Sequence, residues 1–463
     1  MVHKIILKIL LVLLVLLIVS CNIPDERSGI FFGGQIINPS SRSVTFYQGN
    51  NALEMLNLDN NFRFQKKFDS IESGIYKLEH LPEYQTLLLE EKDSLWVRIN
   101  AAAFNASVVF SGIGASKNNF LMELLLKHEA EGEFLSSKYS SNSEIFTTIL
   151  DSLLIEKKEL WIKMDIANSL TPIAQKVTQA AYIYHYATIK ERYALLRGAK
   201  WDEKKDSLYF GYRTFLNFGD NDLAFFDPYI NYILNFISQK AIDKSNTFFK
   251  QKKTTDFNIN RLKVLDQIIT GPVLRNNLAR AIAFEEILTF ENHNQHERFL
   301  QYYSTVNNSP SYFTEVLTLH ANINRMVKNK VLPKVKLQNI YRDTISSSSL
   351  TSNKTTVLYF WSQTQMNHYQ NSLKRLKKLE TNNPHIRFIG ICIQPFNSMV
   401  DQVQEIMKIN LENQFALIDF EKASELWVLT ILNKAIIINE KGNVLEGFGN
   451  FSDLAFEELL KKL

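Results

Sequence analysis

The residues of this chain that could carry thiol chemistry are two cysteines, Cys21 and Cys392, among 463 residues. Thiol chemistry needs an accessible thiolate, which a nearby cation or a helix N-terminus favours. Cys392 lies in the alternating apolar run Ile389-Gly390-Ile391-Cys392-Ile393, which predicts a buried strand and an inert thiol. If Cys21 is modified, the remaining cysteine has no partner for an internal disulfide.

Two segments place histidine where it could act as a base or as a metal ligand. His368 lies near Ser362 and Thr364, but no third group that would orient it for nucleophilic catalysis is identifiable. We therefore expect His368 to pack or hydrogen-bond in the first turn of a helix. His293 and His296 could share a helical face, but no further ligand follows at a known spacing. A solvated helix start explains that segment better, so neither a metal nor a cofactor is expected.

The N-terminal segment predicts export and a lipid anchor. Lys4 and Lys8 precede an apolar run over 9–19, a layout typical of a secretory signal. The run is shorter than the ~20 apolar residues of a membrane-spanning helix. Ile18-Val19-Ser20-Cys21 resembles the bacterial lipobox. That resemblance implies a signal peptide over 1–20 and acyl chains such as palmitate on Cys21, which together anchor firmly. The alternative is an uncleaved apolar anchor with an incidental cysteine.

The residues after Cys21 are predicted to form a tether over 21–28. Asn22 follows the cysteine, where an Asp would be typical of inner-membrane retention. The lipoprotein resemblance therefore implies a cell-envelope location at the outer membrane, facing the periplasm or the cell surface. Asp25 and Glu26 match weakly the acidic surface-export signals of some bacteria, and a solvated tether is the alternative.

The composition is that of a globular protein without a nucleic-acid partner. Apolar residues make up 45% of the chain and charged residues 22%. The net charge is 52 − 48, or +4, and it falls to +2 when Lys4 and Lys8 leave with the signal. The length suggests two to four domains.

Residues 29–115 are predicted to form a β-sandwich. Short alternating apolar runs recur between turn-forming clusters such as Asn38-Pro39-Ser40-Ser41. The runs cover 34–37, 43–47, 62–64, 75–78, 87–89, 95–99 and 108–110. Gly33-Gly34 and Gly112-Ile113-Gly114 lack the pattern of a phosphate-binding loop and are interpreted as turns.

Residues 116–330 are predicted to be helical. Leu121, Leu124 and Leu125 repeat at helical spacing, and Thr171-Pro172 predicts a capped helix start. Aromatic residues are dense, which fits an aromatic ligand groove or, more often, helix–helix packing. They are Tyr182, Tyr184, Tyr186, Tyr193, Phe225, Phe226, Tyr229, Tyr232 and Phe236.

Residues 331–463 alternate between strand and helix patterns, which predicts an α/β domain and, for the whole chain, an α+β multidomain fold. The predicted strands are 356–360, 386–393, 415–418 and 435–438, and the predicted helices are 369–379, 399–409 and 451–463. Asn439-Glu440-Lys441-Gly442 predicts a hairpin turn into Val444-Leu445.

This region resembles the thioredoxin-like domain of periplasmic thiol-disulfide oxidoreductases. Leu332-Pro333-Lys334-Val335-Lys336-Leu337 is similar to the first segment of that domain, Val357-Leu358-Tyr359-Phe360-Trp361-Ser362 to its first central strand, and the stretch from Asn433 to Gly442 to its last hairpin. The chain also resembles bacterial lipoproteins with a β domain, a helical region and a thioredoxin-like domain. Asp93-Ser94-Leu95, Phe110-Ser111-Gly112 and Asn118-Asn119-Phe120-Leu121 are similar to the end of that β domain.

The resemblance implies a site that has lost its redox chemistry. In the family, a cysteine at a helix N-terminus after Phe-Trp forms the thiolate, and a second cysteine three residues on resolves the mixed disulfide. Reading forward from Trp361, these positions hold Gln365 and His368. Asn433 stands at the family's cis-proline position, where we expect a trans bond because a cis bond before a non-proline costs ~2.5–4 kcal/mol. No catalytic residue is therefore expected.

The leading functional hypothesis is non-catalytic: an envelope protein that holds a protein partner, or serves as a scaffold, through the former active-site face or the helical region. The second hypothesis is a periplasmic thiol-disulfide oxidoreductase, which would need a cysteine from elsewhere. The third is ligand or metal binding in the aromatic helical region. The cysteine count favours the first hypothesis over the second.

Overall fold

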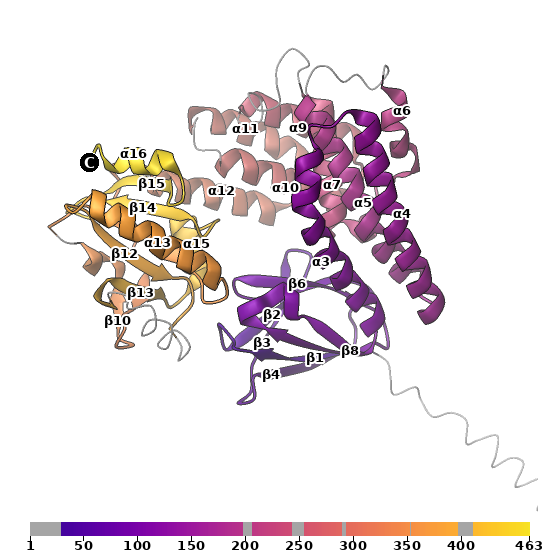
Figure 1. The fold of residues 1–463 in the computed structure, drawn as a ribbon, viewed down its shortest axis with the longest axis horizontal. Coiled ribbons are helices and arrows are strands. Elements are labelled where there is room, and N and C mark those ends of the chain that lie inside the picture. The colour runs from indigo at the N-terminus through magenta and orange to yellow at the C-terminus, as the bar shows by residue number, and fades with distance from the viewer. Residues whose placement is uncertain (1–28, 198–205, 243–253, 289–292, 352, 397–410) are drawn as a thin grey trace, which may run out of the picture.

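The computed structural model describes residues 29–197, 206–242, 254–288, 293–351, 353–396 and 411–463 and gives them a mixed α+β fold (Figure 1). Cys21, the predicted signal peptide and the predicted helix 399–409 lie outside the described residues. Strands come first along the chain, helices follow, and a mixed strand–helix region ends it. Within these ranges no helix is both long enough and apolar enough to cross a bilayer.

The first strands form two four-stranded sheets that enclose one apolar core. The order is β4-β1-β7-β8 in one sheet and β3-β2-β5-β6 in the other. Phe32 of the first sheet lies 5.7 Å from Phe46 of the second, centroid to centroid, so the sheets face each other. The strands are β1 (Ile30–Ile37), β2 (Ser43–Gln48), β3 (Asn51–Asn57), β4 (Arg63–Phe68), β5 (Gly74–His80), β6 (Glu83–Leu89), β7 (Ser94–Asn100) and β8 (Val109–Ile113).

The interpretation of Gly33-Gly34 as a turn is wrong. Both residues lie in the middle of β1, between β4 and β7. A Cβ atom on Gly34 would lie 2.5 Å from the carbonyl oxygen of Val97, so glycine is needed there for the close approach of two strands. Gly112 likewise belongs to β8, whereas Gly114 adopts a positive φ of 92° directly before a helix.

The helical region packs around a large apolar cluster that contains the predicted aromatic residues. The Thr171 hydroxyl accepts a hydrogen bond from the Ala174 amide at 3.2 Å, as expected for a cap before Pro172. The helices of at least seven residues are α3 (Ala115–Lys138), α4 (Ser143–Asn168), α5 (Pro172–Arg197), α7 (Asp227–Ala241), α9 (Thr255–Ile268), α10 (Pro272–Leu288), α11 (His293–Val306) and α12 (Pro310–Arg325). The short helices are α2 (Phe104–Ser107), α6 (Ser207–Phe210), η1 (Ala101–Ala103), η3 (Gly211–Phe215) and η4 (Asn221–Leu223).

The start of α11 is less solvated than the sequence suggested. The helix begins at His293 as expected, but His296 is buried and its ring lies 5.4 Å from that of His320. In the described ranges, no group of three or more histidine, cysteine or acidic side chains is arranged to hold a metal ion.

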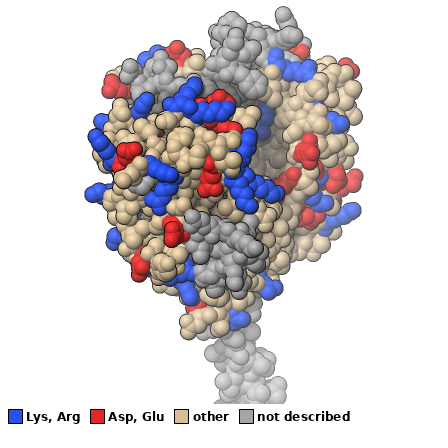
Figure 2. Space-filling model, turned by 60° about the vertical axis from the view of Figure 1, so that its left-hand side comes forward, with Lys and Arg blue, Asp and Glu red and all other residues tan. Residues whose placement is uncertain are grey.

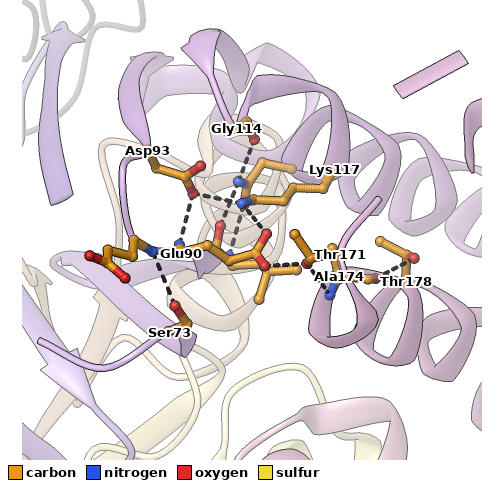
Figure 3. A network of polar contacts seen from close by, with 11 residues as sticks. Ser73, Glu90, Asp93, Gly114, Lys117, Thr171, Ala174 and Thr178 are labelled. Carbon is orange, nitrogen blue, oxygen red and sulfur yellow. Dashed lines mark hydrogen bonds and ion pairs between the residues drawn. The ribbon is translucent and has the colours of Figure 1, made fainter. Parts of the chain in front are cut away.

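A buried ion cluster, which we call the β–helix junction, ties the β sheets to the helices (Figure 3). The Lys117 ammonium on α3 lies 2.5 Å from Glu90 Oε2 and 2.7 Å from Asp93 Oδ2. Its side chain is 5% exposed. Glu90 also accepts a hydrogen bond from Thr171 at the start of α5. Burial raises the pKa of Asp93, and the Lys117 ammonium opposes that rise by favouring the charged carboxylate.

Two asparagines extend this junction along α3. Asn118 pairs with both backbone polar groups of Leu88, at 2.9 and 2.8 Å. Asn119 pairs in the same way with Phe110, at 2.9 Å in each direction. These amides complete the hydrogen bonds of β6 and β8 where each strand meets the helix, which fixes β6 relative to α3.

The C-terminal strands form a mixed sheet in the order β10-β9-β13-β12-β11-β14-β15. β11 is parallel to β12 and antiparallel to β14, and all six of its side chains are buried. Val357, Tyr359 and Trp361 enter one core cluster, while Leu358 and Phe360 enter the other. This alternation is typical of a strand covered on both faces.

The C-terminal elements agree with the predicted strands and hairpin, and the last helix differs from its prediction. The terminal helix is shorter than predicted, since Asp453 caps it. The strands are β9 (Lys336–Gln338), β10 (Thr344–Ser346), β11 (Thr356–Trp361), β12 (Arg387–Cys392), β13 (Gln414–Leu417), β14 (Lys434–Ile438) and β15 (Val444–Asn450). The helices are α13 (Met366–Asn382), α15 (Phe420–Trp427), α16 (Leu454–Leu460), η5 (Ser347–Leu350) and η6 (Leu411–Asn413).

Candidate functional site

The candidate site begins where the central strand β11 gives way to α13. A tight turn separates them: the Gln365 amide donates to the Ser362 carbonyl at 3.3 Å, and the Thr364 amide donates to Ser362 Oγ at 3.2 Å. Gln365 is the N-cap residue of α13, but its side chain makes no capping hydrogen bond. The N-terminus of α13 therefore keeps backbone donors that a nearby acceptor or negative charge can satisfy.

His368 and Asn433 meet directly across this site. His368 Nε2 lies 2.7 Å from Asn433 Oδ1, and because an amide oxygen accepts, the imidazole nitrogen donates. Asn433 Oδ1 also accepts from Ser452 Oγ at 2.8 Å. His368 Nδ1 is buried and has no hydrogen-bond partner among the described residues. In the described chain the cis peptide bond is Leu81–Pro82, so the bond before Asn433 is trans, as expected.

A residue from the N-terminal sheets completes the site. Gln365 Nε2 donates to Glu83 Oε1 at 3.2 Å, across 282 positions of sequence. Glu83 is the first residue of β6, the strand that Asn118 holds against α3. The carboxylate thus lies beside the N-terminus of α13, the end at which a helix favours negative charge.

These residues border a cavity of about 500 Å³, which we call the α13 cavity. Amides, an imidazole, a carboxylate and the Thr430 side chain provide its polar groups, and aliphatic and aromatic side chains provide the rest. The residues are Pro82, Glu83, Phe360, Gln365, His368, Ile393, Phe420, Leu429, Thr430, Ile431, Leu432 and Asn433. None of the described residues that border this cavity carries a thiol.

Cys392 lies beneath the site and outside the cavity. It pairs with Trp361 in the sheet register and is completely buried. Its sulfur lies 3.5 Å from Gln363 Nε2 and 3.5 Å from Gln394 Oε1. Burial raises the pKa of the Cys392 thiol to about 12. A thiol of this kind is neither exposed nor ionised near neutral pH, in line with the prediction of an inert cysteine.

Lys434 is a second buried polar group next to Asn433. Its ammonium donates to the Val428 carbonyl at 3.0 Å and lies 4.1 Å from the centre of the Phe448 ring. Burial lowers the pKa of Lys434 to about 7, and Glu446 opposes that shift. The sheet end beside the cavity therefore holds a lysine that titrates near neutral pH.

The structure brings together the three positions that the sequence singled out. Gln365, His368 and Asn433 all border the α13 cavity, although they come from two separate segments. Pro82 and Glu83 were missed, because nothing in a single sequence links residues 282 positions apart. The charge on this side of the molecule is mixed: Figure 2 shows acidic and basic side chains interspersed on the C-terminal face.

No family model matches this chain, and no curated protein matches it. Among solved structures, the thioredoxin domain of a thiol-disulfide oxidoreductase from Bacteroides vulgatus is 14% identical, with a TM-score of 0.25, and the match covers 29% of this chain and 96% of that chain.

Two further solved structures are also named as thiol:disulfide or thioredoxin proteins. A thiol:disulfide interchange protein from Bacteroides sp. is 14% identical, with a TM-score of 0.24, over 29% of this chain and 87% of that chain. The exposed lipoprotein thioredoxin from Streptococcus pneumoniae is 16% identical, with a TM-score of 0.21, over 28% of this chain and 100% of that chain. The structural neighbours are thus thioredoxin-like thiol-disulfide oxidoreductases that match about 30% of this chain at low identity.

Proposed function

We propose that this chain is a lipid-anchored envelope protein whose C-terminal, thioredoxin-like region binds a protein partner and exchanges no disulfides. The observation that carries the proposal is the composition of the α13 cavity. Gln365, His368 and Asn433 converge there, and the cavity has no thiol. The single thiol of the described chain, Cys392, is sealed in the sheet.

The cavity also suggests what the partner presents. Gln365 already donates to an oxygen of Glu83, next to the open N-terminus of α13. Phe360, Ile393 and Phe420 provide an apolar wall. A segment with an acceptor oxygen beside an apolar side chain would satisfy both surfaces, and it would share or replace the contact with Glu83.

The redox part of the proposal is tested by insulin reduction. The mature protein should not accelerate the reduction of insulin by dithiothreitol above background, and Cys392→Ser should behave identically. Turnover that disappears in Cys392→Ser would instead support the thiol-disulfide oxidoreductase hypothesis.

The binding part is tested by photo-crosslinking in intact cells. A benzophenone amino acid at position 365 should give a discrete protein adduct. The same probe at Leu208, which is 98% exposed on α6, is the matched control. Identical adduct patterns at both positions would exclude a specific partner at the α13 cavity.

The anchor is part of the same proposal and is tested separately. Its support is the apolar run that ends at Cys21, together with the lipobox resemblance. Radiolabelled palmitate should label the wild-type protein and not Cys21→Ala, and wild type should fractionate with the outer membrane. Equal labelling of both proteins would remove the anchor from the proposal.

A further inference from the structure

A second cavity of about 450 Å³ lies in the helical region, far in sequence from the proposed partner site. We call it the α4–α5 cavity. One wall is a stripe on α5, where Gln179, Tyr182, Ile183 and Tyr186 follow one another at helical spacing. The facing wall comes from α4 and includes Leu154, Lys158 and Trp161, and Phe215 of η3 closes the rim. The volume is within the ~300–1,000 Å³ of small-molecule sites.

The polar tips of three aromatic side chains around this cavity are already satisfied by the protein. Trp161 Nε1 donates to Thr178 Oγ1 at 2.9 Å. The hydroxyls of Tyr186 and Tyr212 donate to Glu131 and Glu191, each at 2.7 Å. These rings therefore offer their faces and edges to the cavity while their polar atoms are engaged elsewhere.

Tyr182 is the exception. Its side chain is 97% buried, since 3% is exposed, yet its hydroxyl makes no hydrogen bond to any described residue. That oxygen is also not among the polar atoms that are sealed from solvent. Because solvent reaches this oxygen, water can satisfy it in the free protein, and the open side of Tyr182 is where an acceptor oxygen of a ligand can replace that water. Burial alone raises the pKa of Tyr182 to about 12, which keeps the hydroxyl protonated as a donor.

The charge around the cavity favours an anion. Its charged lining residues are Asp151, Lys158 and Lys190. Lys190 is neutralised by Asp151 at 2.8 Å. Lys158 forms no ion pair within the described part of the chain and is exposed at the rim. With two cations and one anion, the lining has a net charge of +1.

We propose that the α4–α5 cavity binds a small molecule with a flat ring system and a carboxylate. The rings of Trp161, Tyr186 and Phe215 would surround the apolar part, Tyr182 would donate to an acceptor oxygen, and Lys158 would pair with the negative charge. Phe215 is 88% exposed, and a ligand that covers it would remove an aromatic ring from water. This site is independent of the α13 cavity and of whether Cys21 carries lipid.

The probes are 2-naphthoate and its uncharged counterpart 2-naphthamide, titrated by calorimetry into the mature chain from residue 21, which Cys21→Ser keeps free of lipid. For ligands of this size we expect one-to-one binding with a Kd on the order of 0.1–1 mM for naphthoate. Tyr182→Phe should weaken both probes by about 3- to 10-fold, because both present a carbonyl oxygen to the hydroxyl.

Charge and location are tested by two further substitutions. Lys158→Gln should weaken naphthoate about threefold and leave naphthamide unchanged. Lys163→Gln, an exposed lysine of α4 outside the lining, is the matched control. Ala187→Phe fills the cavity and should abolish binding of both probes while circular dichroism stays native.

The proposal is overturned if neither probe binds at millimolar concentration. It is equally overturned if Tyr182→Phe and Lys158→Gln bind both probes as the wild type does. Tyr182→Phe removes a single oxygen, so it remains informative even if Ala187→Phe fails to fold.

Discussion

The β–helix junction and the α13 cavity both concentrate polar side chains at a contact between regions, but they treat those groups differently. At the junction, the Lys117 ammonium has two carboxylate partners and is nearly inaccessible. At the cavity, Gln365 reaches Glu83 through one exposed hydrogen bond, and His368 Nδ1 has no partner among the described residues. Fully paired buried charges specify one geometry, whereas half-paired polar groups at a cavity can change partners. The first arrangement holds the regions together and the second leaves a surface for binding.

The largest effect should come from removing the junction cation. Lys117→Met leaves Glu90 and Asp93 buried without a counter-charge and should lower the free energy of unfolding by about 3–5 kcal/mol. Urea denaturation followed by circular dichroism measures this loss. Lys127→Met removes the exposed pair of Lys127 with Glu123 on the same helix and should cost less than ~1 kcal/mol. Equal losses in the two variants would mean that the junction does not fix the geometry.

Lys434, which lies next to the cavity, should make the free energy of unfolding depend on pH. The folded-state pKa is about 7 and the ordinary value is 10.5. Between these values the unfolded chain binds more protons, so the free energy of unfolding should rise with pH, by up to ~1.4 kcal/mol per unit. Below pH 7 the cost of burying the charge is constant and fully present.

The measurement is urea denaturation at pH 7, 8.5 and 10. Lys434→Met should remove this slope and be more stable relative to wild type at pH 7 than at pH 10. The exposed Lys441→Met should keep the wild-type slope. A slope that persists in Lys434→Met would show that a group other than Lys434 produces it.

An engineered disulfide at the edge of the α13 cavity tests whether residues 365 and 368 face each other at the start of α13. Gln365→Cys with His368→Cys, in a Cys392→Ser background, places two thiols three positions apart at a helix start, where the Cα atoms are ~5–6 Å apart, as a disulfide requires. Mild oxidation should close an internal bridge, worth roughly 2 kcal/mol in the chain-entropy account. Peptide mass mapping detects the bridge. A pair that stays reduced, or links only between molecules, would contradict the register assigned to β11 and α13.

The smallest effect should come from the contact between the two regions at the cavity. Glu83→Gln weakens an exposed hydrogen bond and should change the free energy of unfolding by less than ~1 kcal/mol. Glu91→Gln, an exposed carboxylate near the other end of β6, is the control. If Glu83→Gln lowered the free energy of unfolding by more than ~2 kcal/mol, Glu83 would be a structural charge like those of the β–helix junction, and its contact with Gln365 would not be replaceable.

Local sequence patterns anticipated much of the C-terminal sheet, because its central strands are apolar on both faces. β11 and β14 stand out as continuous apolar runs for that reason. The edge strand β3 was missed, since its side chains are mostly exposed and show no clear alternation. The helix α15 was missed as well, because its eight residues are too few for a helical period to stand out.

Only those residues of the candidate site that lie next to a recognisable strand in the sequence could be predicted. Gln365 and His368 follow the β11 pattern directly, and Asn433 precedes β14. Glu83 joins them through tertiary packing that no local pattern encodes. The same limit explains His296, whose polar neighbours suggested a solvated helix while the tertiary fold buries it against His320.

The sealed position of Cys392 has a practical consequence. Cys392 is the cysteine of the described residues, so in a folded Cys21→Ser variant this part of the chain should be silent toward maleimides and other thiol reagents. Each cysteine introduced at a chosen surface position would then be the single labelling point of that region. Pairs of spin labels or dyes, one on β6 and one on α13, could report the separation of the two regions without any background to subtract.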